Sequence, residues 1–304
     1  MNNQQIVQHG QQYIMNTYAR YPIALVEGSG CRVWDANGKK YLDFLAGIAV
    51  NALGHSHPAV AEAVAEQAKT LIHCSNLYWI KPQVELAQVL VRQSVADKVF
   101  FCNSGAEANE AAIKLARKYA RIKYGEQKYE IITALNSFHG RTMGAITATG
   151  QEKYQKDFAP LVPGFKYVPY NNFAAIKDAV TPNTCAIMLE PVQGEGGVIV
   201  PTDNYLRKVK ELCEKHGLLL IFDEVQTGVG RTGKIFGYEH FGVEPDIFTL
   251  AKGLGGGVPI GAMLAKDKVA ATFVPGDHAS TFGGNPLVCA AALATAETII
   301  NENL

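Results

Sequence analysis

The chain has 304 residues with 28 basic and 28 acidic side chains, so its formal net charge is zero. This balance disfavours nucleic-acid binding, which needs clustered excess Lys and Arg, and no apolar run is long enough to predict a transmembrane span. The six cysteines form no CxxC pair, a pattern typical of free thiols in a reducing compartment and not of disulfides or a zinc site. Because the first residues include no apolar secretory segment, we expect a cytoplasmic globular protein with no membrane partner.

In chain order, the predicted elements change from a small β-rich segment to alternating strands and helices. Residues 21–50 alternate short apolar runs with turn signals, and the Asn37-Gly38 pair predicts a hairpin. Apolar residues at helical spacing then predict a helix over 58–71. The later pattern predicts strands at 99–101, 130–134, 186–190, 218–222 and 247–250, with helices at 106–124 and 202–216. Strands that are apolar on both faces and separated by helices indicate a parallel α/β sheet covered on both sides.

In such sheets, ligands bind at the carboxyl ends of the strands, and the first of these ends precedes the long helix. There Ser104 is a suitable N-cap, and Gly105 permits close approach of a ligand to the backbone. Exposed N–H groups and the helix dipole favour an anion at this position. Glu107 at the third helical position also fits a simple capping box, which is the more economical interpretation of this segment alone.

The next two strand ends carry polar residues whose roles are open when each is considered alone. Phe138 and Arg141 fit either a loop packed on the core, which we favour without context, or an aromatic plate beside a carboxylate clamp. Asp223 directly follows a buried apolar run, so its carboxylate needs a partner. The partner could be structural, a metal or a pyridinium nitrogen, but no histidine stands at a spacing that matches a metal site.

The fourth strand end carries Lys252, followed by four glycines in the next five residues. Most lone lysines are surface charges, but a desolvated lysine at the mouth of a sheet is a nucleophile toward carbonyls. The four strand ends therefore supply an anion site, an aromatic plate, an acid and a Schiff-base lysine. In combination these are the parts that hold pyridoxal 5'-phosphate.

Two other motifs are rejected as functional sites. Gly228 to Gly233 match G-x-G-x-x-G, but no amphipathic helix follows them, so a dinucleotide site in a Rossmann domain is not predicted. His55 and His57 lack the additional ligands that a metal site needs, and we interpret them as loop structure.

With these motifs in place, the chain resembles the class III pyridoxal-phosphate-dependent aminotransferases, which have the aspartate-aminotransferase fold. The resemblance spans nearly the whole chain and is carried by GIAVNALGHSHP from Gly47, FFCNSGAEANEAAIKLARKYA from Phe100, NSFHGRT from Asn136, EPVQGEGGV from Glu190, LLLIFDEVQTGVGRTG from Leu218, PDIFTLAKGLGGGVPIGA from Pro245 and STFGGNP from Ser280. It implies residues 1–50 as the N-terminal part of a small domain and 51–304 as the large cofactor-binding domain with the start of a connecting helix. It also implies that the C-terminal segment of the small domain is missing after Leu304.

The resemblance also implies a role for each site residue. Those that would bind the cofactor are Ser104, Gly105 and Ala106 around the phosphate, Phe138 and Val225 on the two faces of the ring, Asp223 at the ring nitrogen, Gln226 at the ring hydroxyl, and Lys252 as the covalent attachment and catalytic base. Relatives often have Ser or Thr where Ala106 stands, so here only the backbone could serve the phosphate.

The resemblance also implies three residues that would bind substrate. One of these and a fourth residue would reach the active site of the neighbouring subunit. Arg141 would hold a substrate carboxylate, and Glu195 would be a switch that pairs with an arginine of the missing segment. Ser280 would contact substrate and Thr281 the phosphate, both from the neighbouring subunit, which implies a homodimer with shared active sites.

Within this family the chain is most similar to the acetylornithine aminotransferases of arginine biosynthesis. Ornithine aminotransferases carry a tyrosine near the position of Gly47, and its absence here favours an N-acylated ornithine as substrate. The implied reaction moves the side-chain amino group of N2-acetylornithine to 2-oxoglutarate, giving N-acetylglutamate 5-semialdehyde and glutamate. The alternatives are another amino donor (succinylornithine, ornithine or 4-aminobutyrate) and a fragment that binds the cofactor but is inactive.

Overall fold

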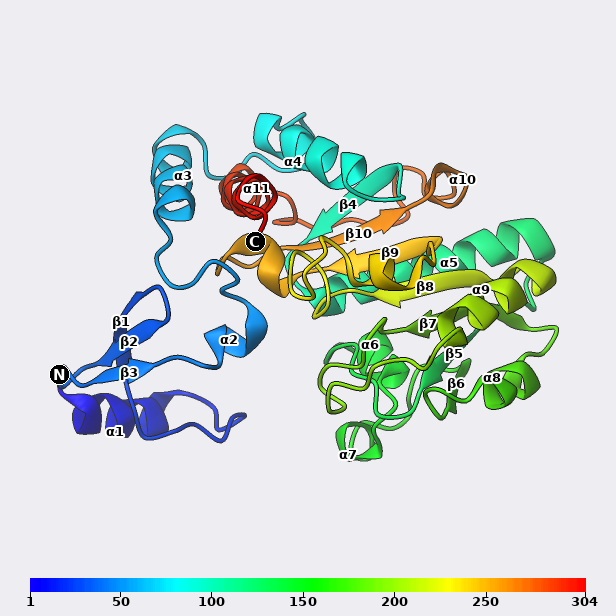
Figure 1. Ribbon diagram of the computed structural model, residues 1–304, viewed down its shortest axis with the longest axis horizontal. Helices are drawn as coiled ribbons and strands as arrows, with labels where there is room; N and C mark the ends of the chain where they lie inside the picture. Colours follow the sequence, from blue (N-terminus) through cyan, green and yellow to red (C-terminus); the bar gives the residue numbers. More distant parts are fainter.

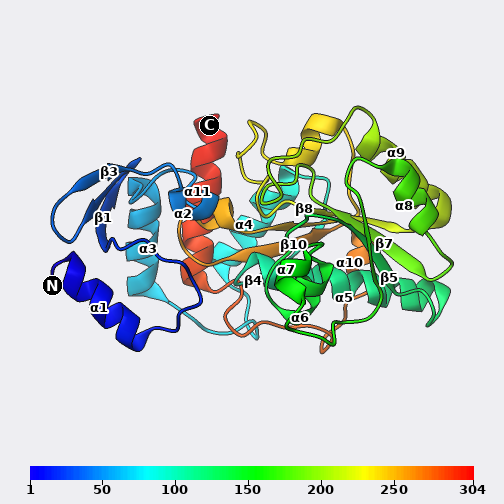
Figure 2. The same ribbon diagram turned by 90° about the horizontal axis from the view of Figure 1, so that it is seen from below.

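The computed structural model describes all 304 residues, which form two separate sheets and the helices around them. The smaller sheet is antiparallel, with the order β1-β2-β3 and the bounds β1 Leu25–Ser29, β2 Arg32–Asp35 and β3 Lys40–Leu42. It confirms the predicted meander, and Asn37-Gly38 make the turn between β2 and β3. With helix α1 (Asn3–Tyr13), this sheet lies at one end of the molecule, away from the larger sheet (Figures 1 and 2). A domain boundary at residue 50 stays a prediction.

The larger sheet has seven strands in the order β4-β10-β9-β8-β7-β5-β6. Their bounds are β4 Lys98–Cys102, β5 Glu130–Ala134, β6 Phe165–Val168, β7 Thr184–Leu189, β8 Leu219–Asp223, β9 Ile247–Leu250 and β10 Gly261–Ala265. The pairs from β9 through β8, β7 and β5 to β6 are parallel. The five predicted strands are therefore confirmed, each within about two residues of its predicted ends.

The sheet is thus mainly parallel, and the exception is β10, which runs antiparallel to both β4 and β9. The chain between Leu250 and Gly261 holds only one short 3-10 helix, η2 (Lys252–Gly255). A parallel crossover needs a dozen or more residues. This connection is too short for one, so the next strand must return in the opposite direction.

Helices cover both faces of the seven-stranded sheet (Figure 1). The helices of the chain beyond the small sheet are α2 Ala46–Ala49, α3 Pro58–Thr70, α4 Lys81–Arg92, α5 Gly105–Tyr124, α6 Met143–Ala148, α7 Glu152–Gln155, α8 Phe173–Ala179, α9 Tyr205–His216, α10 Asp267–Ala270 and α11 Pro286–Asn301, with the 3-10 helix η1 at Gly237–Phe241. The predicted helices over 58–71, 106–124 and 202–216 are confirmed as α3, α5 and α9.

Alternating side chains of each central strand fill two separate cores. In β7, Ile187 and Leu189 pack in the core that includes residues of α4, α8, α9 and α11. Ala186 and Met188, between them, pack in the core formed with α5. Both faces of the strand are buried, which explains why its sequence is continuously apolar instead of alternating.

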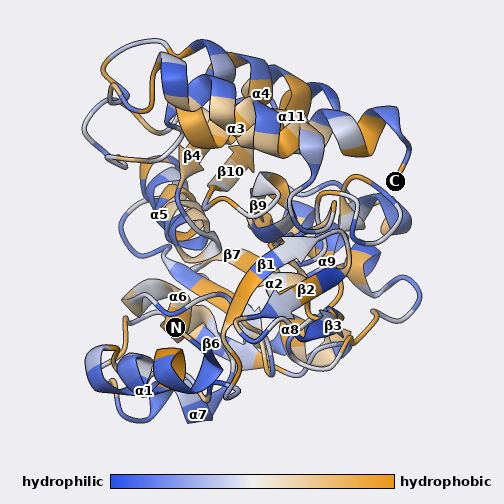
Figure 3. Ribbon diagram, turned by 90° about the vertical axis from the view of Figure 1, so that its left-hand side faces the viewer, coloured by the Kyte–Doolittle hydropathy of each residue, from blue (hydrophilic) through white to orange (hydrophobic).

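Helix α11 packs against α3 and α4, and Figure 3 shows the three helices side by side, with hydrophilic and hydrophobic residues mixed along them. None of the helices in the structure is both long enough and apolar enough to cross a membrane.

Candidate active site

The carboxyl ends of the parallel strands open onto one cavity of about 430 Å³, within the range of small-molecule sites. Nine residues predicted from the sequence line it, and they come from four separate chain segments: Ser104, Gly105, Ala106, Phe138, Arg141, Asp223, Val225, Gln226 and Lys252. The fold therefore brings together the four strand ends that the sequence analysis singled out.

The first wall of the cavity is the start of α5, just after β4. Ser104 is the N-cap, and its Oγ accepts a hydrogen bond from Glu107 N at 3.2 Å. Glu107 does not complete the expected capping box with Ser104, because its Oε2 accepts from Asn103 N at 2.7 Å instead. The N–H groups of Gly105 and Ala106 have no partner in the protein and form, with the helix dipole, a site suited to an anion.

Gly105 is required here by close packing. A Cβ at this position would lie 2.8 Å from Val225 Cγ1, closer than side-chain atoms approach without a shift. Val225 stands on the loop after β8, so the missing side chain of Gly105 keeps the cavity open between α5 and that loop.

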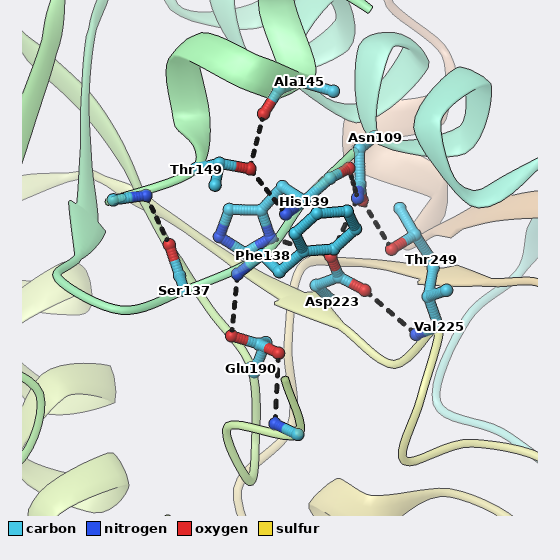
Figure 4. Close-up of polar contacts among 12 residues, drawn as sticks. Asn109, Ser137, Phe138, His139, Ala145, Thr149, Glu190, Asp223, Val225 and Thr249 are labelled. Atoms are coloured by element: carbon cyan, nitrogen blue, oxygen red, sulfur yellow. Dashed lines mark hydrogen bonds and ion pairs between the residues drawn. The ribbon is translucent and has the colours of Figure 1, made fainter. Parts of the chain in front are cut away.

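The floor of the cavity is Asp223, at the end of β8. Its side chain is buried, and its carboxylate accepts three hydrogen bonds from the protein (Figure 4). Its Oδ2 accepts from His139 Nδ1 at 2.7 Å and from Asn109 Nδ2 at 2.8 Å, while its Oδ1 accepts from Val225 N at 2.9 Å. The sequence analysis left a structural partner, a metal and a pyridinium open for this carboxylate. The structure supplies the protein partners, and Asp223 still lines the cavity.

Two of these partners, Asn109 and His139, were not predicted as site residues. Asn109 also donates to the His139 carbonyl at 2.7 Å and accepts from Thr249 Oγ1 of β9 at 2.8 Å, so it ties α5 to two strand ends. A signal for it was present, since a polar residue that falls on the buried face of a long helix needs partners.

Burial and the charge of Asp223 together shift the pKa values of two neighbours, His139 and Glu190. Burial disfavours a charged His139, but the hydrogen bond and charge of Asp223 outweigh it, and the pKa of His139 is raised. Glu190, which follows β7 and also lines the cavity, has its pKa raised to about 7 by burial. Its two backbone hydrogen bonds, from Phe138 N at 3.4 Å and Gly194 N at 3.3 Å, are long.

Lys252 begins η2, just beyond β9, with a left-handed backbone (φ +39°). Its ammonium makes no hydrogen bond or ion pair in the protein, although it is partly buried in the cavity wall. Burial lowers its pKa, against the opposing effects of Asp223 and Glu190. A lysine in this environment gives up its proton more readily than one in water, as a nucleophilic amine requires.

Phe138 and Arg141 form the remaining side of the cavity. The Arg141 guanidinium lies 5.5 Å from the centroid of the Phe138 ring, and the arginine is otherwise exposed. Gln226 lies against the turn at Gly194, where any Cβ would overlap its side-chain amide. The loop interpretation of 136–141, favoured from that segment alone, is too simple because both Phe138 and Arg141 line the cavity.

The other three predicted residues are outside this cavity. Glu195 accepts hydrogen bonds from Tyr154 and Gln151. Ser280 and Thr281 line a neighbouring cavity of about 400 Å³. Ser280 Oγ accepts from Asn103 Nδ2 at 3.1 Å, and Thr281 is exposed.

The two rejected motifs have structural surroundings. Gly228 to Gly233 form consecutive turns with no helix directly after them, so they lack the strand-to-helix arrangement of a dinucleotide site. His55 Nε2 lies 2.6 Å from Asp43 Oδ2 and holds the loop before α3.

Comparison with known proteins places this site in a family. The class-III aminotransferase family matches residues 13–304, so the chain belongs to the class-III aminotransferases. It is 63% identical over 297 residues to an acetylornithine aminotransferase of Caldanaerobacter subterraneus, covering 98% of this chain and 74% of that relative.

Solved structures agree with the fold. An ornithine aminotransferase from Toxoplasma gondii, described with partial occupancy of PLP at its active site, matches with a TM-score of 0.95 at 37% identity, covering 99% of this chain and 72% of that one. An acetylornithine aminotransferase from Elizabethkingia anophelis matches with a TM-score of 0.87 at 39% identity, covering 99% and 74%.

Proposed function

We propose that this chain is an acetylornithine aminotransferase with pyridoxal 5'-phosphate as its cofactor. It would transfer the side-chain amino group of N2-acetylornithine to 2-oxoglutarate, giving N-acetylglutamate 5-semialdehyde and glutamate in arginine biosynthesis. One observation carries the proposal: Lys252 and Asp223 line the same cavity in a chain 63% identical to an acetylornithine aminotransferase.

The residues of the cavity fit the cofactor. The unpartnered N–H groups of Gly105 and Ala106, beside Ser104, suit a phosphate. Because Gly105 has no side chain beside Val225, the cavity keeps room for it. Phe138 and Val225 offer apolar surfaces for the two faces of a flat ring. Asp223 is suited to a protonated ring nitrogen, and Gln226 is the candidate donor to the ring hydroxyl.

The bound cofactor supplies an electron sink for the carbon that bears the reacting amino group. The chain's own contribution is to hold groups and move protons at that carbon. The neutral amine at Lys252 Nζ would take a proton from that carbon and pass it to the bound cofactor, so that the amino group could leave the substrate. His139, Asn109 and Val225 N all donate to the Asp223 carboxylate, and an acceptor held in this way favours a protonated partner in the cavity.

The proposed roles in substrate recognition fall to Arg141, which lines the cavity, and to residues outside it. Arg141 would bind a substrate carboxylate through its planar fork of N–H donors. Glu195 would neutralise a substrate-binding arginine in one half-reaction and swing away from it in the other. Ser280 and Thr281 would complete the partner's site in a homodimer, which is consistent with the exposure of Thr281.

The direct test compares kcat/KM for N2-acetylornithine, N2-succinylornithine, ornithine and 4-aminobutyrate, each with 2-oxoglutarate. We expect N2-acetylornithine to give the highest value, because discrimination is a difference in transition-state binding. A higher value for ornithine or 4-aminobutyrate would overturn the assignment of the donor. Protein that is yellow and dimeric but inactive with all four donors would identify the alternative, a fragment that binds the cofactor without catalysis.

A further inference from the structure

Arg141 is a cation without a partner in the protein, although it lies at the mouth of the cavity. No hydrogen bond or ion pair of its guanidinium is formed with any other residue. It is nevertheless oriented, since its Cζ lies 3.9 Å from the centroid of the Tyr154 ring, much closer than the 5.5 Å to Phe138. Stacking of this kind fixes the plane of an arginine while all its donors stay available.

The same tyrosine also holds a carboxylate, that of Glu195. The Tyr154 hydroxyl donates to Glu195 Oε1 at 2.8 Å, and Gln151 Nε2 donates to Glu195 Oε2 at 2.5 Å. Gln151 is itself fixed by a second hydrogen bond to the Ser137 carbonyl at 2.9 Å. Two neutral donors, at the start and within the first turn of α7, therefore hold Glu195, and the Lys153 ammonium of the same helix lies 3.9 Å from its Oε1.

Glu195 is the group that would compete for Arg141. Burial raises the pKa of Glu195, but Gln151 and Tyr154, followed by the charges of Lys153 and Arg141, outweigh it and lower the pKa overall. The carboxylate is thus an anion that Arg141 attracts. If it moved onto Arg141, it would fill the fork that a substrate carboxylate needs.

We propose that Tyr154 is a specificity-determining positioning residue, whose ring orients Arg141 for a substrate carboxylate and whose hydroxyl keeps Glu195 from occupying Arg141. Gln151 supports the second role. This inference rests on the proposed function, because it takes Arg141 as the carboxylate-binding group of that site. It adds α7 to the site, a helix that contributes no residue to the cavity wall.

The two roles are separable by mutation. Tyr154→Phe keeps the ring and removes the hydrogen bond to Glu195, whereas Tyr154→Leu removes both. The probe is N2-acetylnorvaline, which has the carboxylate of N2-acetylornithine but no side-chain amino group, so calorimetry measures its binding to the holoenzyme without turnover. Glutarate serves as a second carboxylate probe.

We expect Tyr154→Phe to raise the Kd of N2-acetylnorvaline about three- to fivefold, the effect of one partly exposed hydrogen bond to a charged group. Tyr154→Leu should raise it further, because Arg141 also loses its stacking surface. In the kinetics of Tyr154→Phe, KM for N2-acetylornithine should rise by the same factor while kcat changes less than twofold. Tyr129→Phe is the matched control, since Tyr129 also lies near an arginine, Arg117, at 6.0 Å, but its hydroxyl binds no carboxylate.

The decisive variant is the double mutant Tyr154→Phe with Glu195→Gln. A neutral side chain at 195 no longer competes for Arg141, so the double mutant should bind N2-acetylnorvaline as tightly as Glu195→Gln alone. The inference is overturned if Tyr154→Phe binds like the wild type, if the double mutant stays as weak as Tyr154→Phe, or if neither probe binds the wild type. A wild type that binds the probe and responds to these mutations as expected, yet does not transaminate N2-acetylornithine, contradicts the proposed function and leaves the role of Tyr154 standing.

Discussion

Lys252 differs from the other lysines of the chain in being partly buried without any charged or hydrogen-bonding partner. Desolvation lowers its pKa, so the neutral amine is available at lower pH than for a solvated lysine. We predict that Lys252→Ala lowers kcat for N2-acetylornithine by at least about a hundredfold, the usual contribution of a positioned general base. Glutamate release from 2-oxoglutarate measures it, with Lys208→Ala, an exposed lysine of α9, as the control. Turnover by Lys252→Ala close to that of the wild type would contradict the assigned role.

Asp223 and His139 form a buried pair whose charges depend on each other. Because the hydrogen bond and charge of Asp223 raise the pKa of His139 against the effect of burial, Asp223→Asn should lower that pKa. We also expect weaker binding of the cofactor, since the anion for its ring nitrogen is removed. NMR titration of the His139 imidazole and fluorescence titration with pyridoxal phosphate measure the two effects. An unchanged His139 titration would show that the pair is not coupled.

At this scale the sequence located the site but not its supporting residues. Lys252, Asp223 and Phe138 each follow an apolar strand, and the rule that ligands bind at strand ends was enough to group them. Asn109 lies within a helix, and its role depends on which strand ends lie beside that helix. His139 was passed over because a histidine in a loop has many possible partners until the fold fixes them.

The start of α5 is the element on which the proposed phosphate site depends. Gly105→Ala would place a Cβ 2.8 Å from Val225 Cγ1 and force the loop after β8 away from the helix. We predict at least about tenfold weaker affinity for pyridoxal phosphate, measured by fluorescence titration, because both the phosphate cradle and one face of the ring site shift. Gly10→Ala in α1 is the control, since nothing lies near a Cβ there. Equal affinities for the two variants would contradict the role of Gly105.

Two elements that the sequence did not predict, α1 and β10, differ in the physical reason. In α1 no residue is buried, so no apolar periodicity marks it, and it is held by its capping box and by the hydrogen bond of Asn3 to Asp35. Strand β10 has an apolar sequence, but its direction follows from the short connection after β9, not from local propensity. The order β4-β10-β9-β8-β7-β5-β6 is a tertiary property that no single segment encodes.

For the whole molecule, the buried Glu190 predicts how stability depends on pH. Its pKa is about 7 in the fold, against 4.5 for a glutamate in water. Between these values the folded apoprotein holds a proton that the unfolded chain has lost, so this residue makes stability fall as pH rises from about 4.5 to 7. Glu190→Gln should remove that slope and, at pH 8, raise the free energy of unfolding by up to about 3 kcal/mol. Urea unfolding of the apoprotein across this range measures it, and an unchanged slope would contradict the prediction.

The surface of the molecule also predicts association. Trp79 is 93% exposed and Phe44 is 91% exposed, and large apolar side chains in such positions are typical of protein interfaces. We therefore expect a homodimer in sedimentation analysis, and we expect Trp79→Glu to shift it toward the monomer. A wild type that sediments as a monomer of 32.9 kDa would contradict the shared active site proposed for Ser280 and Thr281.

The proposed function requires the amine of Lys252 to carry pyridoxal phosphate in the cavity whose floor is Asp223. The most direct measurement is borohydride reduction of the protein with pyridoxal phosphate, followed by intact mass and peptide mapping. We expect one phosphopyridoxyl group per chain, on Lys252, and none on the Lys252→Ala protein. Labelling spread over several surface lysines, or an unlabelled Lys252, would contradict it.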